Sequence, residues 1–332
     1  MAYAPSRAEP RVVLDASFMR FGFAFVLTGV AACGSRPVPA PPANVDAALT
    51  ATAVAAPAQA TATADLVQNS PAPPALPIDL EAQATAAWAG RAERSELERA
   101  IDLWTRVADS RPSDPAPLVA LSRAYVVLAD FHLRAPSDAG SRSEALERAI
   151  DAAERALMMA SPALAAALKK GTPIDEAVKS VEAGNVVVLA TYGAALARYS
   201  VDKGFTALLM YRGRFTGAMQ RVITVAPDTL YAIADRELGA FYARVPGFAG
   251  GDLAASRTHF DKALQLAPAA LETRLRYAET YAIEARDRAL FVKLVGDIAS
   301  ADLGDATVAP ENTLVKRRAA RIAASTDEIF PK

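Results

Sequence analysis

The chain has 332 residues and a nearly even charge balance, with 36 basic and 37 acidic side chains, so it has room for one large or two ordinary domains. No basic stripe stands out, which excludes nucleic acid as an expected partner. One cysteine and two histidines are too few for a disulfide framework or for a cysteine- or histidine-based metal centre, and no cofactor is expected.

Residues 20–33, RFGFAFVLTGVAAC, have the pattern of a secretory signal. An apolar run of about a dozen residues follows an arginine and ends in small residues, and it is too short to span a bilayer stably. The end of the run resembles a bacterial lipobox, which implies that the thiol of Cys33 is lipidated and becomes the mature N-terminus. A buried structural cysteine is the alternative.

Met19 could be the true start, because residues 1–18 carry Asp15, an unusual residue at the front of a signal. Gly34 after the cysteine, rather than aspartate, favours sorting to the outer membrane, with the body of the protein held in the periplasm by its lipid. Residues 34–77 consist almost entirely of Ala, Pro, Thr, Val and Ser. Such a tract buries too little apolar surface to offset chain entropy, so it predicts a disordered tether.

Helical patterning starts near residue 80. Capping boxes are predicted at Ser95-x-x-Glu98 and at Ser141-x-x-Glu144, and Asp114-Pro115 predicts a helix start with aspartate as N-cap and proline at the first helical position. Thr172-Pro173 predicts another helix start of the same kind. Asn185 is expected to cap a helix over 185–200, which is apolar nearly all round and therefore buried on most sides.

The stretch 238–268 carries the skeleton of a tetratricopeptide repeat, a pair of helices within 34 residues. Leu238-Gly239-x-x-Tyr242 ends the first helix, and Phe260-x-x-Ala263 precedes a terminating Pro268 in the second. The small Gly239 allows close approach of the helices, and the two rings fill the gap between them. Partial copies recur elsewhere, for example Tyr277-Ala278-x-x-Tyr281.

These copies predict an all-α domain over 78–327, made of tetratricopeptide-like helical-hairpin repeats in a compact α-solenoid with a C-terminal capping helix. The repeats are expected at about 79–112, 115–162, 185–227, 228–268 and 269–304, with the capping helix at 309–326.

The order of features resembles the TatT family, the T component that accompanies some tripartite ATP-independent periplasmic (TRAP) transporters. The matching features are the lipobox, TVAP before the helix at 228–244, Leu238-Gly239-x-Phe241-Tyr242, Pro246 followed by Gly250-Gly251, Phe260-x-x-Ala263, Tyr277-Ala278-x-x-Tyr281, Asp287-Arg288 and Phe291. The resemblance covers roughly 79–326. Residues 185–200 differ from the family pattern, because Tyr192 and Tyr199 stand where tryptophans are usual.

The resemblance implies a periplasmic lipoprotein of a family whose characterised members form trimers. Each subunit of those members has a hydrophobic cavity or pore, and they associate with the transporter's soluble substrate-binding component. The cargo proposed for them is an apolar or amphipathic small molecule, carboxylates included. A homotrimer, a substrate-binding protein and a hydrophobic ligand are therefore the expected partners, beside the membrane that holds the lipid.

Aromatic rings gather in the sequence between the third and fourth repeats, and rings with polar tips could line an amphipathic pocket. The candidates are Tyr192, Tyr199, Phe205, Tyr211 and Tyr231. Ordinary packing between helices is the alternative for each of them, and it is the expected role of Tyr242.

The loop VPGFAGGD is about five residues longer than a standard repeat turn. Gly250 and Gly251 allow backbone angles that other residues avoid, and the loop then enters a cap at Asp252. Phe248, after Pro246, could cover a pocket mouth or meet a partner. A plain connection with a buried phenylalanine is the alternative.

Arginines beside apolar helices could bind a ligand carboxylate, or could pair with acids such as Asp235, Glu237 or Glu272. They are Arg212, Arg214, Arg236 and Arg274, of which Arg212 and Arg274 are the ligand candidates. No nucleophile and base come together in the sequence, so the protein is not expected to be an enzyme. The function expected is that of an accessory lipoprotein of a TRAP system, and the alternative is a general tetratricopeptide scaffold for envelope proteins.

Overall fold

The computed structural model describes residues 79–331, and every regular element in that range is a helix. The prediction of an all-α protein is therefore confirmed for the described residues. The predicted signal at 1–33, with Cys33, and the predicted tether at 34–77 lie outside them.

In chain order the elements are α2 (Asp79–Ala89), α3 (Arg94–Ser110), α4 (Pro115–Val127), η2 (Leu128–His132), η3 (Pro136–Asp138), α5 (Ala139–Ala160), α6 (Pro162–Lys169), α7 (Ile174–Ala177), η4 (Val178–Ser180), η5 (Ala183–Asn185), α8 (Val186–Lys203), α9 (Phe205–Val225), α10 (Thr229–Arg244), η6 (Gly247–Ala249), α11 (Leu253–Leu266), α12 (Glu272–Tyr277), η7 (Ala278–Ala282), α13 (Arg288–Ser300), α14 (Ala309–Ala324) and α15 (Thr326–Ile329). The elements η2 and η7 are turns of π-helix that continue α4 and α12, and the other η elements are short 3₁₀ turns.

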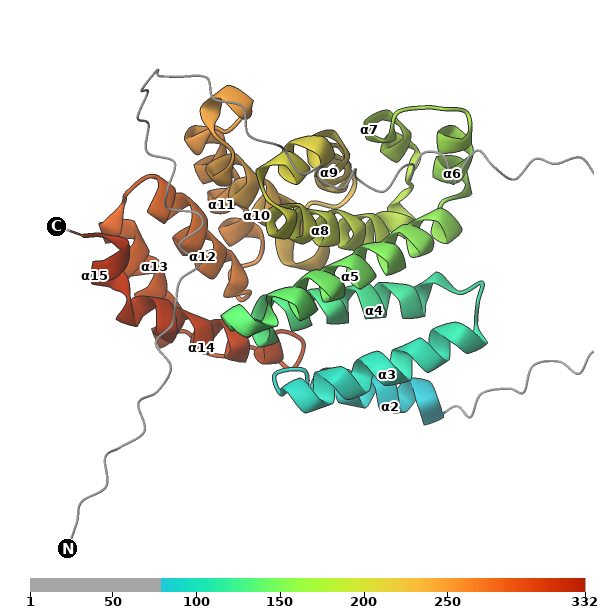
Figure 1. Cartoon of the computed structure of the whole chain (residues 1–332), viewed down its shortest axis with the longest axis horizontal. Helices are drawn as coiled ribbons and strands as arrows, with labels where there is room; N and C mark the ends of the chain where they lie inside the picture. Colours follow the sequence, from blue (N-terminus) through green and yellow to red (C-terminus); the bar gives the residue numbers. More distant parts are fainter. Residues whose placement is uncertain (1–78, 332) are drawn as a thin grey trace, which may run out of the picture. The chain divides into compact units, whose positions relative to one another are not determined.

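Consecutive helices pack as hairpins (Figure 1). Helix α2 pairs with α3, α4 with α5, α8 with α9, and α10 with α11, while α5 also packs against α8. Helix α12 with η7 packs against α13, which contacts α14. The pairs fall within the predicted repeats at 79–112, 115–162, 185–227, 228–268 and 269–304. Their assignment as tetratricopeptide repeats of an α-solenoid stays a prediction.

The hairpin of α10 and α11 is packed as its residue pattern predicts. A Cβ added to Gly239 would lie 2.9 Å from the Phe260 ring, so the helices are too close here for a larger residue. Phe260 is fully buried, and Ser256 Oγ donates a hydrogen bond to the Gly239 carbonyl at 2.7 Å. Tyr242 is half-buried and stacks on His259, so it is a packing residue, as expected.

Both predicted capping boxes are wrong. Helix α3 begins at Arg94, one residue before Ser95, and Glu98 accepts a hydrogen bond from Arg94 Nε at 2.7 Å instead of reaching back to the backbone. Helix α5 begins at Ala139, so Ser141 lies inside it. In both places the chain that precedes the serine is already helical, so the serine side chain has no free N–H groups to cap.

The aspartate caps are confirmed, and two other predicted starts differ from the structure. Asp114 accepts from the Ala116 N–H at 2.9 Å, and Asp252 accepts from the Ala255 N–H at 3.0 Å. Helix α7 starts after Pro173 without a side-chain cap from Thr172. Asn185 precedes α8 as predicted, but its amide donates to the Ala160 carbonyl at 2.6 Å and ties α8 to the end of α5 instead of capping the helix.

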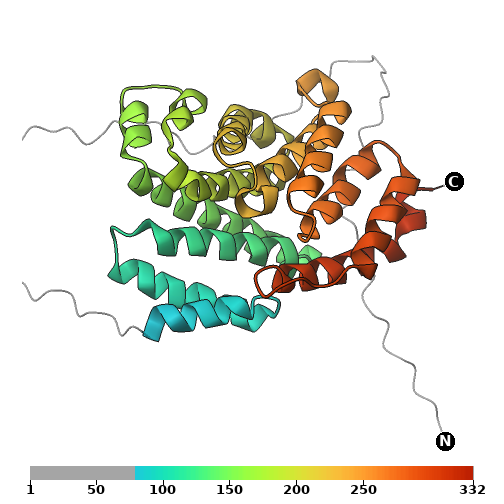
Figure 2. The same cartoon turned by 180° about the vertical axis from the view of Figure 1, so that it is seen from behind.

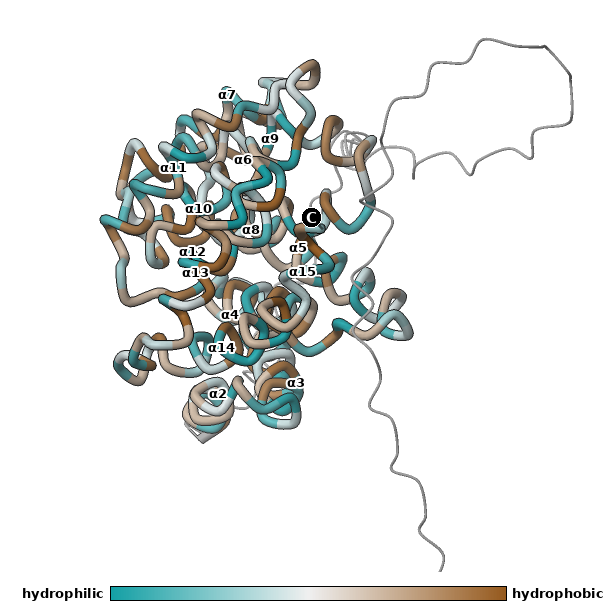
Figure 3. The backbone as a smooth tube through the Cα atoms, turned by 90° about the vertical axis from the view of Figure 1, so that its left-hand side faces the viewer, coloured by the Kyte–Doolittle hydropathy of each residue, from teal (hydrophilic) through white to brown (hydrophobic). Residues whose placement is uncertain are grey.

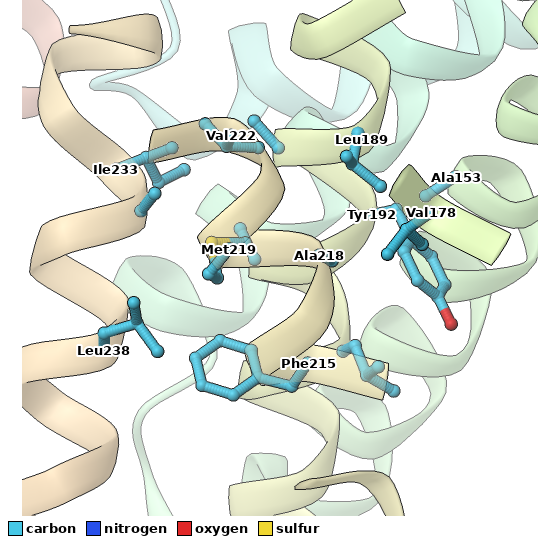
Figure 4. Close-up of a cluster of buried hydrophobic side chains, with 14 of the residues drawn as sticks. Ala153, Val178, Leu189, Tyr192, Phe215, Ala218, Met219, Val222, Ile233 and Leu238 are labelled. Atoms are coloured by element: carbon cyan, nitrogen blue, oxygen red, sulfur yellow. The ribbon is translucent and has the colours of Figure 1, made fainter. Parts of the chain in front are cut away.

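Helices α8, α9 and α10 share one cluster of buried side chains (Figure 4). Met219 of α9 lies beside Leu238 of α10, and Leu189 of α8 belongs to the same cluster. Helix α8 is buried along most of its length, which confirms the prediction from its apolar composition. Hydrophobic and hydrophilic segments alternate along the helices (Figure 3), as expected when one face of each helix packs and the other meets water.

None of the described helices alone is long and apolar enough to cross a membrane. One bent pair, Ile174–Ser180 with Ala183–Lys203, meets the length and composition for a span only when its two parts are taken together, and it bends by 116° at the break.

Candidate functional site

The last long helix returns to the first hairpin and closes the array of helices (Figures 1 and 2). Arg91, in the α2–α3 turn, donates through Nε to Glu311 Oε1 of α14 at 2.6 Å and through Nη2 to the other oxygen of that carboxylate. Arg317 of α14 donates to Glu93 Oε1 at 2.8 Å and to the Ala92 carbonyl at 3.1 Å. These contacts join segments more than 200 residues apart in the sequence.

A cavity of about 920 Å³, half-open to solvent, lies beside this closure, and its size suits a small organic ligand. Its walls come from α2, α4 with η2, α8, α10, α14 and the two connections that follow α11 and α13. The larger apolar lining residues are Trp88, Val126, Val127, Phe131, Leu230, Ile233, Leu266 and Val308. The charged lining residues are Arg91, Arg123, Asp130, Arg198, Asp228, Arg236, Glu272 and Glu311.

A network of buried ion pairs, here called the Arg198 network, forms one part of the wall. Arg198 of α8 donates to Asp130 Oδ2 at 2.6 Å and to Glu272 Oε1 at 3.1 Å, and a third hydrogen bond from its guanidinium reaches Glu237. The positive charge of Arg198 stabilises these carboxylates, because a carboxylate buried away from water without a cation would destabilise the fold.

Two more arginines complete the Arg198 network. Arg276 of α12 also binds Asp130 Oδ2, and Arg236 of α10 lies 3.3 Å from a Glu272 oxygen. With Glu237 as the third acid, three guanidinium groups thus face three carboxylates, so the network is neutral and its hydrogen bonds are satisfied. Arg236 therefore pairs with neighbouring acids, which was one of the two roles expected for it.

The Arg198 network sets the ionisation of its members. Burial would raise the pKa of Asp130, but the nearby charges of Arg276 and Arg198 outweigh burial and hold that pKa well below its ordinary value. Glu237 behaves in the same way, with its pKa lowered by Arg198, Arg276 and Arg236 against the effect of burial. Both acids are therefore ionised in the folded protein at neutral pH.

Asp130 lies in the π-helical turn η2, and Arg276 lies in α12, two residues before the second π-helical turn, η7. A π turn adds a residue to the helical turn and is often found at functional sites. Here the two turns lie on the two helices whose side chains meet in the Arg198 network.

The wall formed by the start of α10 is strained. Leu230, Tyr231 and Ala232 have left-handed backbone angles, with φ of 47°, 60° and 54°. Each such residue costs about 1–2 kcal/mol when it is not glycine. Tyr231 donates its hydroxyl hydrogen to Thr307 Oγ1 at 2.8 Å, and Ala232 is fully buried, so contacts on both sides hold the turn.

Of the aromatic residues that the sequence indicates for a pocket, Tyr231 alone lines this cavity in the part of the chain that the structure describes. Tyr199 and Tyr211 pack edge to face with centroids 5.9 Å apart. Tyr192 is buried at the edge of the α8–α10 cluster, with its hydroxyl pointing away from Met219 (Figure 4). Burial raises the pKa of the Tyr192 phenol. The structure therefore does not bring these rings together around one space.

Phe205 and Phe248 form an exposed aromatic pair. Phe205 begins α9 and is 45% exposed, Phe248 lies in the long loop and is 87% exposed, and their ring centroids are 6.3 Å apart. The burial of Phe248 that the plain-connection interpretation expected is therefore wrong, and the role of the loop stays a prediction.

Close backbone contacts and a hydrogen bond hold the long loop, although its phenylalanine is exposed. Gly250 has a left-handed φ of 96°, and a Cβ on Gly251 would lie 1.5 Å from the Val245 carbonyl oxygen, so neither position accepts another residue without a shift. Arg212 donates to the Ala249 carbonyl at 2.7 Å. Arg212 thus braces the loop from α9, and it does not line the cavity.

The remaining arginine candidates also lie outside the cavity wall. Arg274 is half-buried and donates to the Pro268 carbonyl at 2.7 Å. Arg214 lies over the Tyr211 ring, 5.9 Å from its centroid. His259 binds Asp235 Oδ1 through Nδ1 at 2.7 Å.

Apart from Arg236 and Glu272, sequence reasoning missed the charges that line the cavity, above all Asp130 and Arg198. A signal for both was present, because each is a single charge inside an apolar stretch, in VVLADF and in GAALARY. What the sequence does not reveal is that residues 68 positions apart meet in one hydrogen bond.

These features define a class of protein: an array of α-helical hairpins that closes on itself beside a cavity with apolar walls and a neutralised buried charge network. Within residues 79–331 no group of three or more His, Cys, Asp or Glu side chains is placed to hold a metal ion.

The family of the TRAP transporter T-component matches residues 107–330, which is more than half of the chain. The chain belongs to this family, and the predicted resemblance is confirmed. A comparison with curated proteins gave no match. As a T-component, the protein is an accessory part of a TRAP transport system, which implies a periplasmic or envelope location, and the family is not a known enzyme family.

Proposed function

We propose that the chain is a periplasmic lipoprotein that binds the substrate-binding component of its TRAP system and holds an apolar or amphipathic small molecule. The observation that carries this proposal is the cavity of about 920 Å³ inside a member of the T-component family. A cavity of this size with mixed apolar and charged walls suits a ligand with one polar end.

The exposed aromatic pair is the docking surface we propose for the substrate-binding component. Large rings that remain exposed on a folded protein often mark an interface, and aromatic anchors dominate binding energy. Phe248 is 87% exposed on a loop that Gly251 and Arg212 keep in one conformation. A preformed anchor loses little conformational freedom when it binds.

The test is the affinity of the full chain for the purified substrate-binding protein of the same system, measured by titration calorimetry. Phe248→Ser is expected to weaken the complex by at least about tenfold, as for a central anchor residue. Val292→Ser is the matched control, because Val292 is 52% exposed but lies on α13. Equal affinities of the two variants would exclude the aromatic pair as the docking surface. Failure of the unmodified chain to bind at micromolar concentrations would contradict the partner itself.

The ligand is tested separately by native mass spectrometry of protein purified without detergent. A retained small molecule supports a ligand-binding component. An empty protein that still assembles envelope proteins would favour the alternative, a general tetratricopeptide scaffold with an open groove.

We also propose lipidation at Cys33, anchorage in the outer rather than the inner membrane, and a homotrimer. Cys33→Ser is expected to abolish incorporation of labelled fatty acid and to release the protein into the soluble fraction. Unchanged labelling would show that the lipobox interpretation is wrong. Sedimentation of the released form gives the oligomeric state.

A further inference from the structure

The cavity wall holds one cation without a counter-ion. The guanidinium of Arg123, on α4, makes no hydrogen bond and no ion pair with any residue in 79–331, and its contact is with the Trp88 ring, whose centroid lies 5.4 Å away. The side chain is half-buried, and burial lowers the pKa of Arg123. Arginine stays charged at any physiological pH, so loss of a proton does not relieve the cost of this burial.

The nearest acid is already taken by another arginine. Arg91 donates to both oxygens of Glu311, through Nε at 2.6 Å and through Nη2. The rest of the Arg91 guanidinium is bound to the carbonyls of Trp88 at 2.9 Å and Thr307 at 2.8 Å. Each nitrogen of the Arg91 guanidinium thus donates a hydrogen bond within the wall. Both oxygens of Glu311 already accept from Arg91, so the Glu311 charge is largely compensated before it acts on Arg123.

The other lining charges do not compensate Arg123 either. The Arg198 network is neutral within itself, and its acids accept from Arg198, Arg276 and Arg236. Asp228 is an exposed residue and is absent from the charges that act on the pKa of Arg123. The cavity therefore contains one unpaired positive charge in its wall. A buried charge of this kind calls for a partner of opposite sign.

The surroundings of Arg123 also define the rest of the ligand. Val126 and Val127 follow it on the same face of α4 at three- and four-residue spacing and line the cavity, together with Leu230 and Ile233 from α10. The seven residues from Arg123 to Asp130 correspond to about 10 Å along the helix. The apolar wall thus lies between Arg123, which has no counter-ion, and the Arg198 network, whose charges compensate one another.

We propose that Arg123 is the anchor for the oxyanion headgroup of an amphipathic monoanion, whose hydrocarbon part lies along the apolar wall. This deepens the ligand-binding part of the proposed function and rests on it. Arg123 supplies charge-assisted hydrogen bonds in a fork geometry that matches a carboxylate. The ligand charge neutralises a guanidinium that is already half-buried, so part of its desolvation precedes binding.

The test is calorimetric titration of the full chain with decanoate, decan-1-ol and decyltrimethylammonium, which share one hydrocarbon chain and differ in headgroup charge. Decanoate is expected to bind most tightly. Arg123→Gln should weaken decanoate by roughly tenfold to a hundredfold and leave decanol unchanged, as expected for loss of a charged hydrogen bond. Arg123→Lys, which keeps the charge, should recover part of the affinity.

The matched control is Arg155→Gln, which also removes one positive charge but from the exposed surface of α5, where Arg155 lies 3.4 Å from Asp151. It should leave decanoate binding unchanged, and an equal loss in both variants would show only a general charge effect and overturn the anchor. Equal binding of decanoate and decanol, unaffected by Arg123→Gln, would also overturn the anchor while the cavity remained a ligand site. If the unmodified chain binds none of the three probes, both the anchor and the small-ligand part of the proposed function are wrong.

Discussion

Replacing Arg198 by methionine should destabilise the protein strongly, because this guanidinium binds Asp130, Glu237 and Glu272 at once. Its removal takes a hydrogen-bonded guanidinium away from the buried carboxylates of Asp130 and Glu237, so these two negative charges lose part of their compensation. Loss of one partner from a buried ion pair typically costs about 3–5 kcal/mol. In a domain of this size each kcal/mol lowers Tm by about 2–4 °C, so a fall of about 6–20 °C is expected.

The measurement is thermal unfolding followed by circular dichroism, with Arg148→Met as the control. Arg148 pairs with Glu144 at 2.6 Å on α5, but both side chains are about 60% exposed. Such a pair contributes about 0.3–0.5 kcal/mol, so the control should lose no more than about 2 °C. A Tm for Arg198→Met equal to that of the control would refute the reasoning, since it would mean that the acids around Arg198 are compensated or hydrated without it.

Three further predictions concern the long loop, the cavity wall and acid stability. Gly251→Ala should displace the loop backbone, because the new Cβ would lie 1.5 Å from the Val245 carbonyl oxygen, whereas Gly247→Ala meets nothing within 4 Å; limited proteolysis of the loop should accelerate in the first variant only. Asn312→Ala should cost about 1–3 kcal/mol in urea unfolding, because its buried amide accepts from the Leu271 N–H at 2.9 Å and donates to the carbonyls of Ala269 and Leu303. No loss of stability would mean that water replaces the amide. The pKa of Asp130 is lowered in the folded protein, so the stability that this carboxylate contributes is complete above about pH 4, near its unfolded pKa, and is lost as the pH falls further. Tm should therefore be level from pH 7 to about 5 and should drop below about pH 4. A Tm that stays level down to pH 3 would contradict this prediction.

Local patterns in the sequence were sufficient for much of the fold. Apolar spacing at three and four residues, prolines at helix ends and aspartate caps depend on neighbours within one or two turns, so Asp114 and Asp252 were assigned correctly. The packing of Gly239 on Phe260 was also predictable, because one repeat brings both residues into the same hairpin. The serine capping boxes failed because each motif lay inside a helix that had already begun.

The location of the cavity was decided by the tertiary structure alone. Three tyrosines are close in sequence, but residues on a helix point in directions set by its 3.6-residue turn. Tyr192 is therefore buried in the core, and Tyr199 packs against Tyr211. The sequence by itself determined the helices, their hairpins and the family, since those depend on local periodicity and on a contiguous pattern. The cavity exists because Arg91 meets Glu311 and Asp130 meets Arg198, and only a closed array of helices brings such distant charges together.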